Sequence, residues 1–464
     1  MKRPASESWT GTYTAICRIH PRMTQNERRH AFELSPPSPG VLLRRGFTIG
    51  GVVVRRAASA GWHATLARVR HEEVVEAKTF RRELRRALED LGPTFVKLGQ
   101  LLSARSDVIP PGLQRELAML RDHAPSISRA ALVAEFESRV GPSLIESFAT
   151  FDVVPVACAS IGQVHRATLA DGRRVAVKVR RPGVRAEIDM DLALLRSFLQ
   201  FAMRVSRSVR RYDPVALLDE FAAMLRAETD YNVEAENMNA VRRALENDDV
   251  VAIPNAITEL SSESVLVMDW LEGIPLSRPE ELDAAGTDRA ALARAVTHSY
   301  ALMLFHSDRF HADPHPGNLI AQTDERLGLV DFGEVGYIDD KIRTALIGLL
   351  GAVLVRDSAA LGQAVAAVSR SVRDVDRQGL GPDLDRLLRP ISNTTLQDMK
   401  LGRVLGELFH VLRRYGLVLP AELAILLKTV IECEGTTNEL DPGFAMNDFL
   451  AELGQSIAVA DTES

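Results

Sequence analysis

The spacing of apolar and polar residues changes along the chain and predicts successive kinds of structure. Residues 1–40 lack periodicity and end in a run rich in proline and serine, so we expect a disordered tail there. From residue 41 to residue 147 the apolar positions recur with helical spacing, broken at Gly92-Pro93 and again at Pro110-Pro111. This part of the sequence therefore predicts an N-terminal helical extension made of several helices.

Between residues 148 and 268 the apolar period shortens to that of strands. Asp171-Gly172 lies between two β-rich runs, where an Asp-Gly pair is a strong signal for a hairpin turn. A long helical stretch from 184 to 246 interrupts the strands. We expect a small lobe that is rich in β-structure and also carries helix. The predicted strands are 151–156, 162–169, 174–179, 250–253 and 265–268.

The pattern of residues 269–455 is mostly helical, and a short tail, 456–464, follows it. No internal repeat is visible. The predicted elements are a helix at 288–305, short strands at 318–321 and 327–330, and further helices from 338 to about 453. The order of elements therefore predicts an α+β protein in which a β-rich lobe precedes a helical lobe.

Composition places the chain among ordinary globular proteins. It has 464 residues, of which 46% are hydrophobic and 25% are charged, and this excludes a disordered or disulfide-stapled chain. Its three cysteines, Cys17, Cys158 and Cys433, are far apart and form no CxxC pair. We therefore expect a reducing, cytoplasmic compartment and no structural zinc site.

Charge is distributed unevenly along the chain. The net charge is −6, but residues 1–100 hold 18 Lys and Arg against 9 Asp and Glu. A basic segment of this kind can attract an anionic membrane surface or nucleic acid, and the simpler explanation is a basic tail with solvated helix faces. The apolar stretch 344–355 has about a dozen residues, whereas a spanning helix needs ~18. We expect no transmembrane segment and no signal peptide.

The first candidate for chemistry is Lys178, near the end of the strand that follows the hairpin. A lysine at a strand end is usually solvated, but a run of small residues lies on the strand before the hairpin. Small side chains let backbone N–H groups approach a phosphate closely, and Lys178 would then reach the phosphates as a point charge. The run contains a single glycine and is weak evidence by itself. Its expected nucleotide contacts are Ala157, Ala159, Ser160, Ile161, Gly162 and Val164.

A second motif comprises His311, Asp313 and Asn318. A carboxylate followed five residues later by a carboxamide has the spacing of a kinase catalytic loop, HRDxxxxN. Asp313 can orient a hydroxyl nucleophile or accept its proton, and Asn318 can supply an oxygen to magnesium. The tripeptide Asp331-Phe332-Gly333 follows an apolar strand, and Asp331 can bridge a metal to the phosphates. We expect His311 to pack and hold the loop rather than to bind zinc.

Two acidic residues on the helical stretch offer a partner for Lys178. Glu228 and Glu234 are six residues apart, which turns them about 600° around a helix, so they face different directions. A glutamate in this stretch can pair with Lys178 and hold its ammonium against the phosphates. The two glutamates should therefore have different roles.

Together these motifs resemble those of the UbiB/AarF family of atypical protein-kinase-like proteins, over roughly residues 85–445. The segment Phe95-Val96-Lys97-Leu98-Gly99-Gln100 is similar to the KxGQ signature of that family. Residues 156–165 resemble its alanine-rich loop, with Cys158 where alanine is usual. Glu228-x-Asp230 is similar to its ExD motif, and Glu234 falls where the partner of the lysine is expected.

The resemblance implies a bilobal protein-kinase-like fold, with a β-rich N-lobe at 148–268 and a helical C-lobe at 269–455. The KxGQ extension would pack over the nucleotide cleft, and Lys97 and Gln100, three apart on one helix, would point into it together. Glu228 and Asp230 are the natural partners for Lys97. The resemblance also implies that Glu234 pairs with Lys178, and that the hinge brings Met268 and Trp270 near the adenine. The implied regulatory lid comprises Lys97, Gln100, Glu228 and Asp230.

The resemblance further implies an enzyme that uses ATP and Mg²⁺, as an ATPase or phosphotransferase that supports isoprenoid quinone biosynthesis or membrane lipid homeostasis. Its catalytic residues would be Asp313, Lys178 and Glu234, and its magnesium ligands would be Asn318 and Asp331. No Ala-Pro-Glu follows Asp331-Phe332-Gly333, and helical sequence resumes soon after it. Phosphorylation of other proteins is therefore not favoured.

Three other functions stay open at this stage: a nucleotide-gated pseudokinase module, a conventional Ser/Thr protein kinase, and a small-molecule phosphotransferase of the aminoglycoside type. The expected partners are the nucleotide, a lipid or quinone-precursor small molecule and the inner face of the membrane, contacted peripherally. Nucleic acid is not an expected partner, and no oligomeric state is predicted. Magnesium-dependent ATP turnover separates the enzyme from the pseudokinase.

Overall fold

The computed structural model begins with a bundle of helices. It describes residues 39–69, 73–104, 109–120, 127, 147–206, 214–323, 326–371, 378–389 and 400–444. Gly92 ends the second helix with a φ of +99°, a left-handed conformation that glycine adopts readily, so the predicted break is confirmed. The first helix begins at Pro39, inside the predicted tail; the rest of that tail, and residues 456–464, lie outside the described residues. The helices are α3 (Pro39–Val69), α4 (Glu73–Leu91), α5 (Pro93–Ala104) and α6 (Pro111–Leu117).

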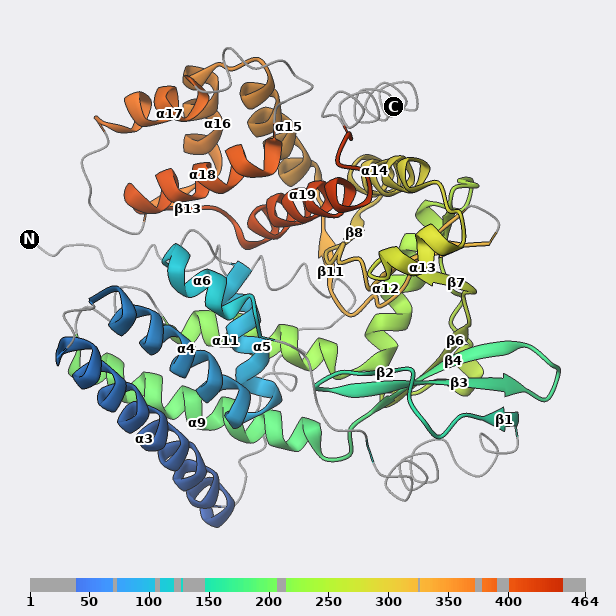
Figure 1. Ribbon diagram of the computed structural model, residues 1–464, viewed down its shortest axis with the longest axis horizontal. Coiled ribbons are helices and arrows are strands. Elements are labelled where there is room, and N and C mark those ends of the chain that lie inside the picture. Colours follow the sequence, from blue (N-terminus) through green and yellow to red (C-terminus); the bar gives the residue numbers. More distant parts are fainter. Residues whose placement is uncertain are drawn as a thin grey trace, which may run out of the picture.

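An antiparallel five-stranded sheet forms the core of the first lobe (Figure 1). Its strands are β1 (Phe148–Phe151), β2 (Ala157–Cys158), β3 (Gly162–Leu169), β4 (Arg174–Arg180) and β6 (Val265–Asp269). Strands β3 and β4 form the predicted hairpin, and Gly172 in its turn has a φ of +88°. On one face of the sheet Val175, Val177 and Val267 pack into a small hydrophobic core. The opposite face is therefore left for the rest of the molecule.

The predicted strand at 151–156 is wrong. Strand β1 ends at Phe151, the chain bends through 152–156, and β2 begins at Ala157. Pro155 lies in this bend and has no backbone N–H to give to a sheet, which explains why the strand does not continue. The bend still lies against β3, because the backbone N–H of Asp152 donates to the carbonyl oxygen of Arg166 at 2.9 Å.

Three helices replace the single helical stretch that was predicted after β4. They are α9 (Val184–Val205), α11 (Pro214–Glu228) and α12 (Tyr231–Ala244). Asp230 separates the last two, because its side chain accepts the backbone N–H of Asn232 at 3.1 Å and caps α12. Figure 1 shows α9 and α11 beside the N-terminal helices, while α12 lies between the sheet and the second lobe.

The second lobe is mostly helical, as predicted, and contains the larger hydrophobic core. Helix α19 is buried along most of its length, through Leu423, Leu427 and Val430 among others, and it packs against α14, α15 and α18 (Figure 1). The helices of the second lobe are α13 (Pro279–Ala284), α14 (Arg289–His306), α15 (Asp340–Leu354), α16 (Ser358–Val368), α17 (Leu380–Leu388), α18 (Leu401–Arg414) and α19 (Ala421–Leu440).

Short strands position the loops between these helices. A four-stranded sheet contains β5 (Val251–Ala252), β10 (Leu327–Leu329), β9 (Leu319–Gln322) and β7 (Gly273–Pro275) in that order. Strand β5 lies in the sequence range predicted for the first lobe, yet it pairs with β10 and so connects the lobes. Five other strands, β7 and the four given next, were not predicted from the sequence. Each has only two or three residues, too few to show the period of a strand. The four are β8 (Arg309–His311), β11 (Val335–Tyr337), β12 (Arg370–Ser371) and β13 (Leu417–Val418).

The N-terminal helices contact both lobes. Arg45 of α3 pairs with the buried carboxylate of Asp191 on α9 at 2.7 Å, and α5 packs against α9 and α11. On the other side, Arg413 of α18 donates to the carbonyl oxygen of Ile109 at 3.0 Å. The α+β fold class, with a β-rich lobe before a helical lobe, is confirmed. Across the part of the chain that the structure describes, no helix combines enough length and apolar content to cross a bilayer.

Candidate functional site

One face of the first sheet gathers several of the side chains that the sequence singled out. The register places Val164 opposite Lys178, Lys178 opposite Leu266, and Ala176 opposite Met268. Side chains directly opposite each other in a sheet lie on the same face, and every second residue along a strand shares that face. Val164, Lys178 and Met268 therefore point to the side away from the valine core, where α12 and the second lobe approach.

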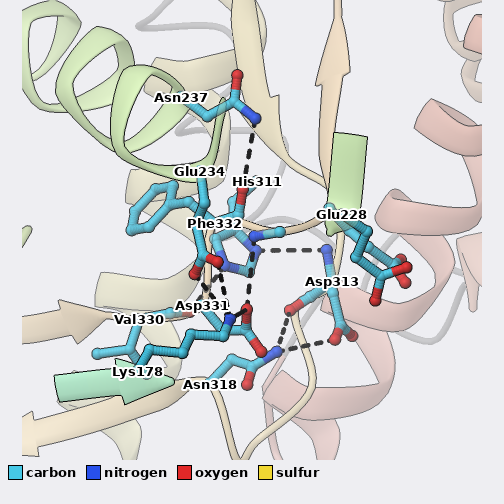
Figure 2. A network of polar contacts seen from close by, with 12 residues as sticks. Lys178, Glu228, Glu234, Asn237, His311, Asp313, Asn318, Val330, Asp331 and Phe332 are labelled. Atoms are coloured by element: carbon cyan, nitrogen blue, oxygen red, sulfur yellow. Dashed lines mark hydrogen bonds and ion pairs between the residues drawn. The ribbon is translucent and has the colours of Figure 1, made fainter. Parts of the chain in front are cut away.

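Lys178 contacts two acidic side chains on this face. Its Nζ is 2.9 and 2.8 Å from the two carboxylate oxygens of Glu234 and 2.9 Å from Oδ1 of Asp331 (Figure 2). Glu234 belongs to α12 and Asp331 follows β10, so one ammonium group joins the two lobes. Burial opposes the charge on Lys178, but the two carboxylates raise its pKa well above the ordinary value. The same ammonium holds the pKa of Asp331 well below its usual range.

The small residues between β2 and β3 form a tight turn next to this face. The backbone N–H of Ala159 donates to the carbonyl oxygen of Gly162 at 2.8 Å and closes the turn. A Cβ at position 162 would overlap the hydroxyl of Tyr231 and lie 2.7 Å from the carbonyl oxygen of Val179, so this position requires glycine. The Tyr231 hydroxyl is buried and has no hydrogen-bond partner among the described residues.

Side chains of the same turn lie in different environments. Ile161 is buried in a hydrophobic core that α9 and α11 complete, so it could contact a nucleotide only through its backbone. Ser160 is buried as well, whereas Ala157 is exposed. Val164 is half-buried and packs against the main core from the sheet face that also carries Lys178. The turn therefore offers a nucleotide mainly backbone groups and small side chains.

The predicted catalytic loop runs from the end of β8 to the start of β9. Asn318 donates from Nδ2 to Oδ2 of Asp313 at 2.8 Å (Figure 2). His311 is fully buried, its Nε2 lies 3.0 Å from the carbonyl oxygen of Val330, and its ring meets Phe332 edge-on at 5.1 Å. The backbone N–H of Asp313 donates to Nδ1 of His311 at 3.3 Å. His311 thus packs and holds the loop, as the sequence predicted.

Asn318 and Asp331 lie side by side because one precedes β9 and the other follows its antiparallel partner β10. The backbone N–H of Val330 donates to the carbonyl oxygen of Asn318 at 3.0 Å. Asp331 has a φ of +64°, a left-handed conformation that is uncommon outside glycine and clusters at functional sites. Because Asn318 uses its amide nitrogen on Asp313, its side-chain oxygen stays available for a cation.

These two oxygen donors suit a magnesium ion that also binds phosphates and water, rather than a metal held by protein side chains alone. Mg²⁺ usually binds one or two protein oxygens and completes its coordination with substrate phosphates and water. Asn318 and Asp331 supply that set. Among the residues that the structure describes, no group of three His, Cys, Asp or Glu side chains is arranged to hold a metal.

The N-terminal extension reaches the site through Lys97 of α5. Lys97 is 7% exposed, and its Nζ forms an ion pair with Oε1 of Glu228 and lies 3.8 Å from Oε1 of Glu334. Two predicted lid residues lie elsewhere. Gln100 donates to a main-chain carbonyl just beyond α6 at 3.4 Å, because α6 packs on α5 at that point. Asp230 caps α12, so the partner of Lys97 is Glu228 and not Asp230.

The residues predicted near an adenine lie at the end of β6. Met268 is buried, and Trp270 follows two residues later, so both are on the sheet face that carries Lys178. The guanidinium of Arg166 lies 4.4 Å above the centre of the Trp270 ring. This cation–π contact holds the indole against β3.

Three further residues near the site were missed from the sequence. Asn237 of α12 donates to the carbonyl oxygen of Phe332 at 3.4 Å (Figure 2). Lys428 of α19 forms an ion pair with Glu432 at 3.2 Å, in the electrostatic field of Asp313 and Glu334. In the sequence, Lys428 and Glu432 have the spacing of an ordinary surface pair on a helix, so only the tertiary structure could reveal their position.

Comparisons with known proteins give consistent results. The ABC1 atypical kinase-like domain matches residues 119–365, and the UbiB helical domain matches residues 384–445. "Probable protein kinase UbiB" from Xylella fastidiosa strain 9a5c is 35% identical over 376 residues, which is 80% of this chain and 68% of that protein. Its counterpart from strain M12 gives the same identity and coverage. The solved complex of Rv3197 with erythromycin from Mycobacterium tuberculosis aligns at a TM-score of 0.54 and 25% identity, covering 76% of this chain and 90% of that one.

Proposed function

The chain belongs to the ABC1/UbiB family of atypical kinase-like proteins, and from this premise we propose that it is a magnesium-dependent enzyme that breaks down ATP or transfers its γ-phosphoryl group. The fold is kinase-like, and kinase-like ATP binding follows from the family. The finer proposal is that this activity supports isoprenoid quinone biosynthesis or membrane lipid homeostasis. The name of the Xylella relatives and the surface of α3, described below, favour that role.

The observation that carries the proposal is the contact of Lys178 with both Glu234 and Asp331. An ammonium held by a helix carboxylate on one side and an aspartate of the second lobe on the other is the arrangement that phosphoryl transfer needs. In the proposed complex, Lys178 would bind the phosphates while Glu234 keeps it oriented. Asn318 and Asp331 would hold magnesium, which when bound supplies charge neutralisation at the β- and γ-phosphates.

Asp313 is the proposed partner of the nucleophile. Its Oδ2 is held by Asn318, and its backbone N–H is held by His311. A carboxylate that is positioned in this way can accept a hydrogen bond from water or a hydroxyl group and orient the attacking oxygen. The site would therefore act by positioning and electrostatics, which is how enzymes of phosphoryl transfer generally work.

The acceptor is more consistent with water or a small molecule than with a protein. Helix α15 begins at Asp340, directly after β11, so the segment after Asp331 is short. Lys97 and Glu228 form a largely buried ion pair nearby, and Lys97 also lies 3.8 Å from Glu334, which follows Asp331 by three residues. These two features disfavour the conventional Ser/Thr protein kinase, because a peptide would need that space.

Helix α3 supports the proposal of peripheral membrane contact. Leu43, Phe47 and Val54 are exposed and lie on one face of the helix, since they are four and seven residues apart. Arg44 is exposed next to that face, as is Arg55, which also pairs with Asp90 at 2.6 Å. Basic residues beside exposed apolar ones favour an anionic lipid surface.

The test is ATP turnover by the full chain with magnesium, with EDTA, and with vesicles of anionic or neutral lipid, followed by a panel of phenols that resemble quinone precursors. We expect magnesium-dependent turnover, and we expect Asp331→Ala to lower it by about 100-fold or more. Asp340→Ala is the matched control, because Asp340 is a fully exposed aspartate at the start of α15.

If Asp331→Ala leaves turnover and nucleotide affinity unchanged, the proposed site is wrong. Tight nucleotide binding by the wild-type protein without turnover under any lipid condition would instead favour the pseudokinase.

A further inference from the structure

Helix α19 is attached directly to the catalytic loop. Thr429 donates from Oγ1 to the carbonyl oxygen of Ala312 at 3.2 Å, and Thr436 donates to the carbonyl oxygen of Pro314 at 2.9 Å. Both threonines are buried, and the two carbonyls flank Asp313. Residues seven apart share one face of a helix, so this face of α19 is held against the loop on both sides of the aspartate.

Lys428 and Glu432 lie on the neighbouring face of the same helix. Around the helix axis both lie on the same side of the threonine face, within about 100° of it. They form an i,i+4 ion pair at 3.2 Å. Their side chains are partly exposed, at 28% and 40%. Lys428 is therefore partly open to solvent, while the neighbouring face of its helix is anchored on both sides of Asp313.

The charges around Lys428 are mostly negative. Glu432 on its own helix, Glu334 before β11 and Asp313 in the catalytic loop all act on its ammonium. Burial opposes the charge, and these carboxylates raise the pKa of Lys428 above its ordinary value. Lys428 is thus a stable cation at neutral pH that the charge of Asp313 reaches.

The other two lysines of the site bind carboxylates away from Glu432, the partner of Lys428. Lys178 contacts Glu234 and Asp331 on the nucleotide side, and Lys97 pairs with Glu228. A phosphoryl group that moves toward Asp313 carries negative charge into a region lined by carboxylates, and this is unfavourable without a further cation. Lysine suits this task because its flexible stem lets the ammonium follow the moving group.

We propose that Lys428 is a phosphate-contacting residue, whose ammonium binds the equatorial oxygens of the γ-phosphoryl group as it passes to the nucleophile at Asp313. In that step the bond from the γ-phosphorus to the bridging oxygen breaks, and its electron pair leaves with ADP. A bond forms from the oxygen of water or a hydroxyl acceptor to the phosphorus, and the proton of the nucleophile passes to Asp313. The role rests on the proposed function.

The experiment compares Lys428→Met, Lys428→Arg and the control Lys341→Met, which replaces an exposed lysine on α15. Each protein is assayed for steady-state ATP turnover and for the dissociation constant of Mg·ADP, which lacks the γ-phosphoryl group. We expect Lys428→Met to lower kcat by ~10- to 100-fold with the ADP affinity changed less than twofold. Lys428→Arg should recover most of kcat, and Lys341→Met should match the wild-type protein.

The outcomes separate this role from the proposed function. Wild-type turnover with an unchanged kcat in Lys428→Met overturns the role of Lys428 and leaves the proposed function standing. The role of Lys428 is also overturned if Lys428→Arg does not restore kcat, or if ADP affinity falls in parallel with kcat. A structural defect would explain either result. Absence of turnover in the wild-type protein overturns both. Lys428→Gln gives the same test if the methionine variant does not fold.

Discussion

At the scale of single residues, the site depends on cations that are shared between carboxylates. Lys178 faces Glu234 and Asp331 at once, and each carboxylate comes from a different lobe. Lys178 and Glu234 are largely buried, so the removal of either one would leave the other as a costly unpaired charge, whereas Asp331 is 52% exposed. This mutual dependence explains why the lysine and the helix glutamate have to be positioned together.

Glu432 gives a residue-scale prediction of pH dependence. Burial raises the pKa of Glu432 from 4.5 to about 7; the cation of Lys428 opposes this rise, and the negative charges of Asp313 and Glu334 add to it. Between pH 4.5 and about 7 Glu432 keeps its proton in the folded protein but has released it in the unfolded chain. The contribution of Glu432 to the free energy of unfolding is therefore fully present below about pH 4.5 and is lost as the pH rises toward 7. Glutamine does not titrate.

We therefore expect the free energy of unfolding of the wild-type protein, minus that of Glu432→Gln, to fall between pH 5 and pH 8. Urea denaturation of both proteins at the two pH values measures it. A difference that stays constant or grows with pH would contradict the raised pKa.

At the scale of elements, α5 acts as a cover that Lys97 attaches to the edge of the site. Lys97 enters from the N-terminal extension, and Glu228 is the last residue of α11. Elsewhere α5 packs against α4, α6, α9 and α11, and its Thr94 donates from Oγ1 to Oδ2 of Asp191 on α9 at 2.8 Å. The Lys97–Glu228 pair is therefore a polar link between the extension and the edge of the site.

Lys97→Ala tests this link. The substitution leaves Glu228 largely buried without its cation, and we expect the free energy of unfolding to fall by about 2 kcal/mol. Because the cover is loosened, we also expect ATP turnover to rise or the nucleotide preference to change. Urea denaturation and steady-state kinetics measure the two effects, with Lys341→Ala as the control. Kinetics identical to those of the wild-type protein would count against α5 as a regulatory lid.

At the scale of the whole molecule, the site lies where the two lobes meet. The β-rich lobe contributes Lys178, and the helical lobe contributes Asp313, Asn318 and Asp331. Neither lobe holds the full set. A nucleotide bound between the lobes would therefore stabilise their arrangement as well as occupy the site.

We accordingly expect Mg·ATP to stabilise the full chain, by about 2.7 kcal/mol at a concentration 100 times its dissociation constant. Thermal unfolding with and without the nucleotide measures this, and EDTA should remove most of the effect, because the phosphates would then lack the cation between Asn318 and Asp331. Equal stabilisation in EDTA and in magnesium would show that the metal is not held as proposed.

Part of the site could be predicted because its signals are local. The hairpin at Asp171-Gly172 follows from turn chemistry, and the spacing from Asp313 to Asn318 and on to Asp331 is written in consecutive residues. The sequence also determined the α+β class and the succession of lobes. Hydrogen bonds within a turn, and the period of a helix or strand, depend on neighbouring residues, so the chain alone carries them.

The tertiary structure decided which of these residues meet. Glu228 and Glu234 were known to face different ways, and packing assigned one to Lys97 and the other to Lys178. Gln100 turned toward α6, and the strand predicted at 151–156 gave way to a bend at Pro155. Lys428 feels the charge of Asp313 because α19 is held against the catalytic loop through Thr429. Contacts of this kind depend on how distant elements pack, and no local period or turn signal encodes that packing.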